Sequence, residues 1–373
     1  MSGIYLHIPF CRKACSYCNF HFSTLLKNKS TVVKAMADEI LLRKEFLSDK
    51  NLKTIYFGGG TPSILSELEL DDLINVIHNH FSVDENTEVT LEVNPEDVTI
   101  DKLKSWKKST INRLSLGVQS FDDEELKWMK RSHTGAQSIN STKIAQQAGF
   151  TNISIDLIYG GPILNYEKWR STLEIVKDLN VQHLSCYNLT AEENTLLGRN
   201  ILKGKDQKIN DEGSAGQFEL LMDWSELSGF EQYEISNFSK HGFHSRHNSS
   251  YWTGTPYLGI GPSAHSYDGV NRSWNISNNS IYVNGIMSGQ LNFSREEISE
   301  EIGYHEYMLT RLRTKWGVNT TEIEFRFPKY FAHFKQQLLK EIQCGNVSQI
   351  ENKVILTRRG KLLADLVTAN FFV

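Results

Sequence analysis

Short apolar segments alternate with longer segments of helical periodicity through the first half of this 373-residue chain. We predict strands at residues 3–9, 54–57, 88–93, 113–118, 152–158 and 183–189. The helices predicted between them span residues 32–46, 67–80, 99–107, 122–147 and 166–179. Strands that alternate with helices in this way are typical of β/α units, in which helical crossovers join parallel strands. The sequence therefore predicts an α/β fold with a parallel sheet.

The residues at the end of each predicted strand distinguish between two architectures, because six units fit either a doubly wound sheet or an incomplete barrel. Chemically distinctive residues lie at or near the carboxyl end of every strand: a cysteine loop, residues 58–62 (GGGTP), residues 92–95 (EVNP), Gln119, Asp156 and residues 187–192. Active sites of barrel enzymes gather at that end of the strands. We therefore expect a partial (β/α)6 TIM-like barrel.

Composition and periodicity divide the chain into three predicted regions. The barrel covers residues 1–200, and an extension rich in Ser, Asn, Gly and aromatic residues covers residues 201–293. Residues 294–373 return to helical periodicity and include a predicted hairpin at residues 347–356 and a last helix at residues 359–369. Helices combined with a β-hairpin resemble a winged-helix module. Because this region has no basic face, we expect it to pack on the barrel or cover it, and not to read DNA.

Charge and hydropathy exclude several classes of partner. The net charge is −4, so the basic footprint of a nucleic-acid-binding protein is missing. No stretch approaches the roughly 18 consecutive apolar residues of a membrane span. The first ten residues carry no signal-peptide pattern. We expect a cytoplasmic protein without membrane insertion; peripheral membrane association and a homodimer are both compatible with the sequence.

Three of the five cysteines, Cys11, Cys15 and Cys18, lie within eight residues of one another. Such a cluster in a reducing compartment indicates a metal site. A [4Fe–4S] cubane takes four ligands, so three thiolates leave one iron open to a small molecule. A structural zinc ion would need a fourth ligand, which His7 or His21 could supply. Zinc therefore remains the alternative.

The cysteine spacing and its surroundings resemble a known superfamily. C-x3-C-x2-C with Tyr17 before the last cysteine is similar to the radical S-adenosylmethionine (SAM) superfamily. Within it, residues 4–11 (IYLHIPFC) and 58–62 (GGGTP) resemble the family of oxygen-independent coproporphyrinogen oxidases (HemN) and the related haem chaperones (HemW). The resemblance covers essentially the whole chain, including the C-terminal module.

The resemblance implies a [4Fe–4S] cluster on the three cysteines and SAM bound at its open iron. The residues that it implies around this SAM molecule are Tyr5, Tyr17, Gly59, Gly60, Thr61 and Glu92. Residues that in HemN contact a second SAM molecule are matched here by Gln119, Arg131 and Asp156. From the residues alone, the strand-end polar groups of this set could instead satisfy the backbone, and Arg131 could be a solvated helix residue.

Two features favour the HemW branch of the family over HemN. HemN has a further cysteine two positions after its last cluster ligand, where this chain has Phe20. Residues 247–252 (HNSSYW) fit the H-N-x-x-Y-W signature of HemW, which implies haem binding by His247, Asn248, Tyr251 and Trp252. A histidine is a common axial ligand of haem iron, and aromatic rings can stack on the macrocycle. Alternatively, His247 and Trp252 anchor this segment on the barrel.

The leading functional hypothesis is a haem chaperone that binds haem and transfers it to apo-haemoproteins, with respiratory enzymes as the acceptors that the resemblance implies. The alternative is a radical enzyme that decarboxylates coproporphyrinogen III to protoporphyrinogen IX. A third hypothesis is a radical enzyme with another substrate.

Overall fold

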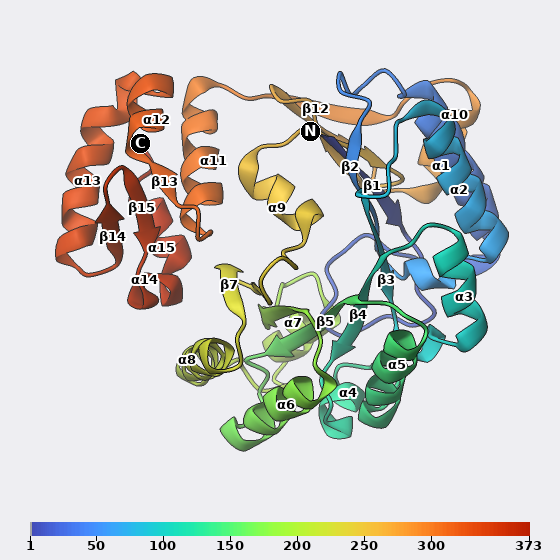
Figure 1. The fold of residues 1–373 in the computed structure, drawn as a ribbon, viewed down its shortest axis with the longest axis horizontal. Helices are drawn as coiled ribbons and strands as arrows, with labels where there is room; N and C mark the ends of the chain where they lie inside the picture. The colour runs from blue at the N-terminus through green and yellow to red at the C-terminus, as the bar shows by residue number, and fades with distance from the viewer. Residues whose placement is uncertain (1) are drawn as a thin grey trace.

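Six parallel strands lie side by side in chain order at the centre of one large sheet in the computed structural model, which describes residues 2–373 (Figure 1). These strands are β1 (Ser2–Ile8), β2 (Leu52–Gly59), β3 (Glu88–Val93), β4 (Arg113–Gln119), β5 (Asn152–Tyr159) and β6 (His183–Asn188). The helices that follow them are α1 (Lys29–Leu42), α2 (Glu67–His80), α3 (Ile100–Lys108), α4 (Asp123–Trp128), α5 (Gly135–Gln147) and α6 (Tyr166–Leu179). All five pairings between neighbouring strands are parallel. The partial (β/α)6 barrel predicted from the sequence is confirmed.

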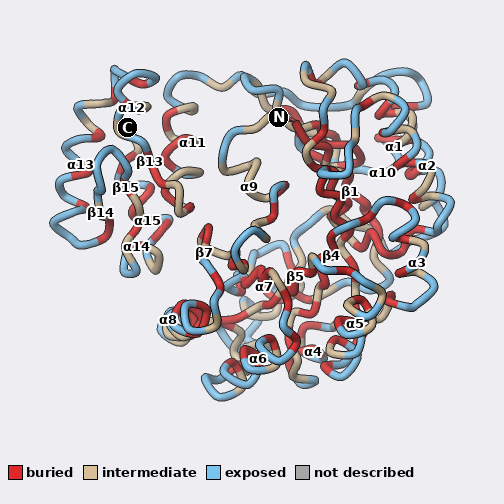
Figure 2. The backbone as a smooth tube through the Cα atoms, viewed as in Figure 1, coloured by how far each residue is buried: buried red, intermediate tan, exposed pale blue. Residues whose placement is uncertain are grey.

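The strands send alternate side chains to the helices and to the barrel interior, as pleated strands do. In β4, Leu114, Leu116 and Val118 are fully buried in the apolar core shared with the helices. The residues that alternate with them, which include Arg113 and Ser115, face the interior. The buried segments of the chain concentrate on these strands (Figure 2). The outward faces therefore supply packing, and the inward faces supply polar groups.

Helix starts follow their sequence signals, with one difference from the prediction. Ser66 and Glu69 form a capping box at the start of α2, and Asn165 caps α6. The single helix predicted at residues 122–147 is wrong, because the chain leaves the helix after α4 and re-enters it at α5. Thr134 caps α5 and forms a second capping box with Gln137. This interruption places residues 129–134 in a loop.

The extension does not form a separate layer but lengthens the central sheet at both edges. Next to β1, it adds β9 (Tyr257–Ile260), β10 (His265–Tyr267), β11 (Asn271–Asn275) and β12 (Phe293–Glu297). Next to β6, it adds β8 (Asn237–Ser239) and β7 (Glu231–Glu234). Its helices are α7 (Leu196–Leu202), α8 (Asp211–Leu227), α9 (Arg246–Thr253) and α10 (Asn279–Met287). The boundary expected between residues 293 and 294 falls inside β12.

The C-terminal residues pack around an apolar core of their own. They comprise α11 (Glu300–Leu312), β13 (Val318–Asn319), α12 (Thr320–Arg326), α13 (Phe331–Gln343), β14 (Val347–Ile350), β15 (Lys353–Leu356), α14 (Arg358–Leu362) and α15 (Ala364–Ala369). The predicted hairpin is present, whereas the last helix is broken at Leu363. Short 3-10 turns occur at Leu26–Asn28, Pro62–Ile64, Pro95–Asp97 and Pro328–Tyr330. Within residues 2–373, no helix is both long and apolar enough to cross a membrane.

Backbone hydrogen bonds join this C-terminal module to β7 and the residue that follows it in the extension. The N–H of Ile235 donates to the carbonyl of Arg313 at 3.1 Å, and the N–H of Lys315 donates to the carbonyl of Tyr233 at 2.9 Å. Helix α11 also contacts α9, which lies between the module and the sheet (Figure 1). The short helix α9 is therefore packed from both sides.

A buried carboxylate on α1 holds the extension against the barrel. Glu39 is fully buried and accepts hydrogen bonds from Arg43 at 3.0 Å and from Asn275 at 2.8 Å on one oxygen. Its other oxygen accepts from the Gly261 N–H at 2.8 Å and from the Tyr282 hydroxyl at 2.6 Å. Three of these four donors belong to the extension, so a single side chain joins β11, α10 and the turn after β9 to α1.

Replacement of Glu39 by Ala should lower the free energy of unfolding by about 3–5 kcal/mol, because it leaves the buried Arg43 guanidinium without its carboxylate. Urea unfolding followed by circular dichroism measures the change. Glu45→Ala removes an exposed ion pair to Lys50 just after the same helix and serves as the control, with an expected effect under about 1 kcal/mol. Equal effects of the two substitutions would contradict this role of Glu39.

Candidate functional site

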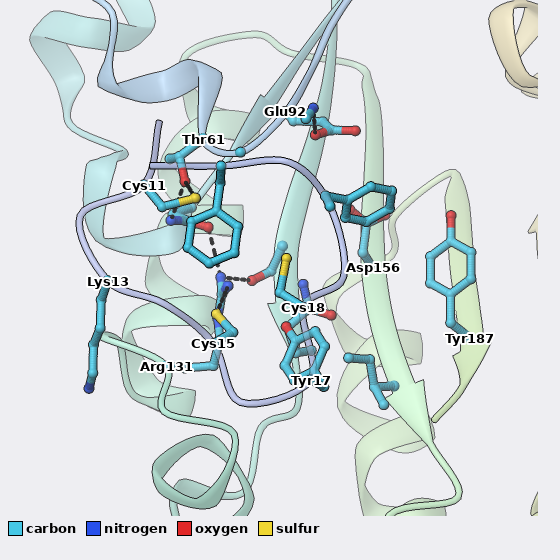
Figure 3. A pocket seen from close by; sticks show the side chains of 18 of the residues that line it. Cys11, Lys13, Cys15, Tyr17, Cys18, Thr61, Glu92, Arg131, Asp156 and Tyr187 are labelled. Carbon is cyan, nitrogen blue, oxygen red and sulfur yellow. Dashed lines mark hydrogen bonds between the residues drawn. The ribbon is translucent and has the colours of Figure 1, made fainter. Parts of the chain in front are cut away.

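A cavity of about 570 Å³ opens at the carboxyl ends of the six parallel strands. The cysteine loop after β1 crosses its mouth, and Figure 3 shows Cys11, Cys15 and Cys18 along one side with Glu92 and Asp156 deeper among the strands. Strand-end residues expected from the sequence form much of the remaining wall. The cavity therefore lies where a barrel fold places its active site.

The thiols in this loop receive hydrogen bonds from the cavity wall. The Thr61 hydroxyl donates to Cys11 Sγ at 3.4 Å, and the Arg131 guanidinium donates to Cys15 Sγ at 3.4 Å. Burial raises the pKa of Cys11 to about 11 and also raises that of Cys18. Metal coordination removes the thiol proton despite such burial, and donors beside the sulfurs stabilise the thiolates that remain. The donor set thus fits a metal cluster.

The geometry differs from that of a single-ion site. Within the part of the chain that the structure describes, no group of three or more His, Cys, Asp or Glu side chains converges as ligands of one metal ion. The side-chain nitrogens of His7, one of the candidate zinc ligands, are occupied by the His21 carbonyl at 2.9 Å and the Tyr5 hydroxyl at 3.2 Å. A cubane binds each thiolate to a different iron, so the three sulfurs surround one cluster and do not share a single metal ion.

The glycines after β2 allow two strand ends to approach closely. The N–H of Gly60 donates to the Ile8 carbonyl at 2.9 Å, and a β-carbon at Gly60 would lie 2.7 Å from the Phe10 carbonyl oxygen. Gly59 has φ +104°, in the region that favours glycine, and a β-carbon there would lie 2.6 Å from the His7 ring. These glycines are therefore needed to seat the cysteine loop, in addition to any contact with a ligand.

Two buried carboxylates lie beneath the loop. Glu92 accepts a hydrogen bond from the Tyr56 hydroxyl at 2.8 Å and another from the Gly59 N–H at 3.2 Å. Burial, with the nearby Asp156 carboxylate second, raises the pKa of Glu92 to about 7. Burial also raises the pKa of Asp156, although Ser115 donates to both of its oxygens at 3.0 and 3.2 Å. Two such carboxyls in a cavity are poised to bind polar hydrogens of a ligand.

The loop between α4 and α5 brings Arg131 into the cavity, contrary to the solvated helix position that the sequence left open. Besides Cys15, its guanidinium donates to Asn94 Oδ1 and to the Gly117 carbonyl, both at 2.7 Å. Gln119 also lines the cavity and has φ +68°, an uncommon conformation for a residue with a side chain. Such strain at a strand end is typical of functional sites.

The expected SAM residues converge on this cavity with one exception. Its lining includes Tyr17, Gly59, Gly60, Thr61, Glu92, Gln119, Arg131 and Asp156. Tyr5 does not line it, because its ring lies behind the wall with centroids 6.0 Å from Tyr56 and 6.1 Å from His247. The strand period explains this arrangement, since Tyr5 faces inward three residues before the end of β1.

The expected haem residues lie together on α9, outside this cavity. His247 is fully buried, and its two ring nitrogens lie 2.8 Å from the Thr54 hydroxyl and 2.8 Å from the Tyr251 hydroxyl. Burial lowers the pKa of His247 to about 3, so the imidazole is neutral. A neutral imidazole has one N–H and one lone pair, and both are engaged here. In this conformation His247 has no free nitrogen for an iron atom.

The other residues of the motif are more accessible. Asn248, Tyr251 and Trp252 are all partly exposed. The Trp252 ring lies 5.9 Å from the Arg313 guanidinium of α11, a cation–π distance. This end of α9 therefore faces the junction with the C-terminal module, while His247 faces the barrel interior.

Comparisons with known proteins agree with this geometry. The sequence profile of the radical SAM superfamily matches residues 5–176. A Bacillus subtilis protein named heme chaperone HemW is 33% identical over 382 residues, which cover 100% of this chain and 99% of that protein. The Escherichia coli protein of the same name is 31% identical, over 96% of this chain and 95% of its own. The chain belongs to the HemW family of radical SAM proteins.

A solved structure supports the fold of this HemW family member. The structure of coproporphyrinogen III oxidase (HemN) from E. coli, described as a radical SAM enzyme, matches with a TM-score of 0.85 over 99% of this chain and 89% of its own. Because the sequence identity is 23%, this likeness concerns the fold alone. The sequence matches confirm the family resemblance drawn from the cysteine loop and the GGGTP segment.

One cavity residue that bonds a carboxylate of the site was not singled out from the sequence. Tyr56 lines the cavity, and its hydroxyl donates to Glu92. Its side chain faces inward by strand alternation, two positions before Gly58. A polar side chain on the inward face near a strand's carboxyl end was the signal that could have found it.

Replacement of Cys15 by Ser should abolish the visible absorption of the reconstituted protein and reduce bound iron from about four atoms per chain to near zero. Iron and sulfide analysis after anaerobic reconstitution measures this. Cys344→Ser changes an exposed cysteine of the C-terminal module and should leave the iron content unchanged. Stoichiometric zinc without iron in the unaltered protein would refute the cluster.

Proposed function

We propose that this protein is a haem chaperone that binds haem and transfers it to apo-haemoproteins, and that it carries a [4Fe–4S] cluster with SAM bound beside it. The observation that carries the proposal is the similarity to proteins named heme chaperone HemW, which extends through the barrel, α9 and the C-terminal module. The acceptors would be respiratory haemoproteins, and the site of action would be the cytoplasm. The exposed Phe20 lies where HemN has a further cysteine.

Cys11, Cys15 and Cys18 would hold the cluster. When bound, the cluster supplies an open iron for the amino and carboxylate groups of SAM and a source of single electrons. Thr61 and Arg131 would hydrogen-bond to the ligating sulfurs, as they do to the thiols here. Glu92 and Asp156 would accept hydrogen bonds from SAM, while Gln119 and Tyr17 would complete the wall around it.

Haem would bind at the exposed side of α9. Trp252 offers a ring that can stack on a macrocycle, and Asn248 lies one helical turn before it. Tyr251 is partly exposed beside them, with its hydroxyl bonded to His247. The neighbouring Arg313 offers a cation for a haem propionate. Support for this placement comes from the partial exposure of these residues at the junction between α9 and α11.

A radical decarboxylase acting on coproporphyrinogen III is the second candidate. The likeness in fold to HemN favours it, and so do the cationic side chains of Arg12, Lys13, Lys130 and Arg131 in the cavity lining, which could hold substrate carboxylates. Phe20 and the motif on α9 favour the chaperone.

Anaerobically reconstituted protein should transfer haem to an apo-haemoprotein and should show no turnover of coproporphyrinogen III. Transfer is followed by the absorption spectrum of the acceptor, and turnover by fluorescence of the oxidised product. A HemN enzyme assayed in parallel serves as the positive control. Efficient decarboxylation would refute the chaperone proposal.

Trp252→Ala should weaken haem binding about 3- to 10-fold by removal of a stacking ring, with the iron content of the cluster unchanged. Haem titration followed by absorbance measures this. Trp274, a partly exposed tryptophan on β11, provides the matched control as Trp274→Ala and should bind haem normally. Unchanged haem affinity in Trp252→Ala would place haem elsewhere.

A further inference from the structure

The start of α9 is attached to the barrel interior by polar contacts. The Glu88 carboxylate of β3 accepts the backbone N–H groups of Arg246 and His247 at 3.1 and 3.0 Å. The His247 ring then reaches β2, where Thr54 bonds one nitrogen. Gly3 leaves space for this contact, because a β-carbon there would lie 2.4 Å from the Thr54 hydroxyl. His247 is thus held as a fixed part of the barrel interior.

The same ring supports a residue of the cavity. The Tyr56 and His247 rings stack with centroids 4.8 Å apart and planes at 24°. Tyr5 extends the stack on the β1 side, with its plane at 29° to that of Tyr56. The Tyr56 hydroxyl at the far end of this ring donates to Glu92 Oε1 at 2.8 Å. One of the two hydrogen bonds that hold the Glu92 carboxylate therefore comes from a ring packed on His247.

We infer that His247 is a positioning residue of the SAM site: it fixes the Tyr56 ring, and Tyr56 in turn orients the Glu92 carboxylate. This inference rests on the proposed binding of SAM in the cavity. The histidine of the H-N-x-x-Y-W motif then supports SAM binding, and the exposed residues of α9 bind haem.

Packing explains how His247 acts at a distance. Truncation of His247 to Ala would leave space beside the Tyr56 ring in an otherwise close-packed interior. The ring could then turn into that space, and its hydroxyl would leave Glu92. The Gly59 N–H would remain as the donor to the other carboxylate oxygen.

The charged and titratable groups that face Glu92 predict a pH signature. Burial and the Asp156 carboxylate raise its pKa, whereas the Tyr56 hydroxyl, the Gly59 N–H and the buried Arg113 guanidinium lower it, leaving it about 7. Tyr5, Tyr187 and Tyr251 also lie close enough to interact electrostatically with Glu92, whose negative charge raises the pKa of each.

The direction of the pH effect follows from the acceptor role of Glu92. The ionised carboxylate accepts hydrogen bonds from a ligand, so SAM should bind more tightly as the pH rises through 7 and more weakly as it falls. Loss of the Tyr56 hydrogen bond raises the pKa of Glu92 further. The binding profile should then move to higher pH.

The test is SAM binding by the full-length, cluster-reconstituted protein between pH 6 and 9, by equilibrium dialysis, with Tyr56→Phe, His247→Ala and the double variant. Each single variant should bind SAM about 3- to 10-fold more weakly at pH 7 and recover most of the loss near pH 8.5. The double variant should resemble the single variants, because both substitutions remove the same hydrogen bond. His247→Phe keeps a ring against Tyr56 and should stay within about twofold of the unaltered protein.

Other outcomes overturn the inference in distinguishable ways. A pH profile of His247→Ala identical to that of the unaltered protein, or a loss equal at every pH, would show that His247 does not act through Glu92. Loss of haem binding in His247→Ala with a normal SAM profile would return His247 to the haem site. If the unaltered protein bound no SAM at any pH, the proposed SAM function itself would fail. Iron content, measured in every variant, reports on folding of the site.

Discussion

The cavity depends on the close approach of β1 and β2 at their carboxyl ends. Gly60 lies against the backbone of residues 8–10, in space that a β-carbon would fill, and its N–H bonds the Ile8 carbonyl. The cysteine loop leaves β1 at this point, so backbone packing decides where its thiols lie. Thr61, next in the chain, is thereby brought within hydrogen-bonding distance of Cys11. The segment GGGTP is thus a structural requirement of the cysteine loop as well as a wall of the cavity.

The central barrel could be predicted because its signals are local. Strand alternation and helix caps lie within a few residues of one another, and six repeats of the same unit reinforce the interpretation. The edge strands could not be predicted in the same way, since β7, β8 and β10 are three or four residues long and owe their pairing to distant partners. The interruption before Thr134 did have a local signal, a capping box, which the prediction of one long helix overlooked.

The sequence predicted most of the residues that belong to the site, but it did not predict which of them are buried. Strand-end positions indicated Glu92, Gln119 and Asp156, because the carboxyl ends of parallel strands share one edge. The motif at residues 247–252 indicated chemistry but carried no information about burial. His247 bonds Thr54, 193 positions earlier in the chain, and such long-range contacts follow from the assembled fold alone. Tyr56 lies between that histidine and the cavity, and its stacking on His247 could not be predicted for the same reason.

Helix α9 has two faces in different environments. One carries His247 into the barrel, and the other presents Trp252 to Arg313 and the C-terminal module. At only eight residues it is too short to bend, so whatever tilts one face tilts the other. Thermodynamic linkage then makes the effect mutual. If a ligand bound at the junction changes the affinity for a ligand inside the barrel by some factor, the ligand inside the barrel changes the affinity at the junction by the same factor. The module and the barrel interior thus both contact this one rigid helix.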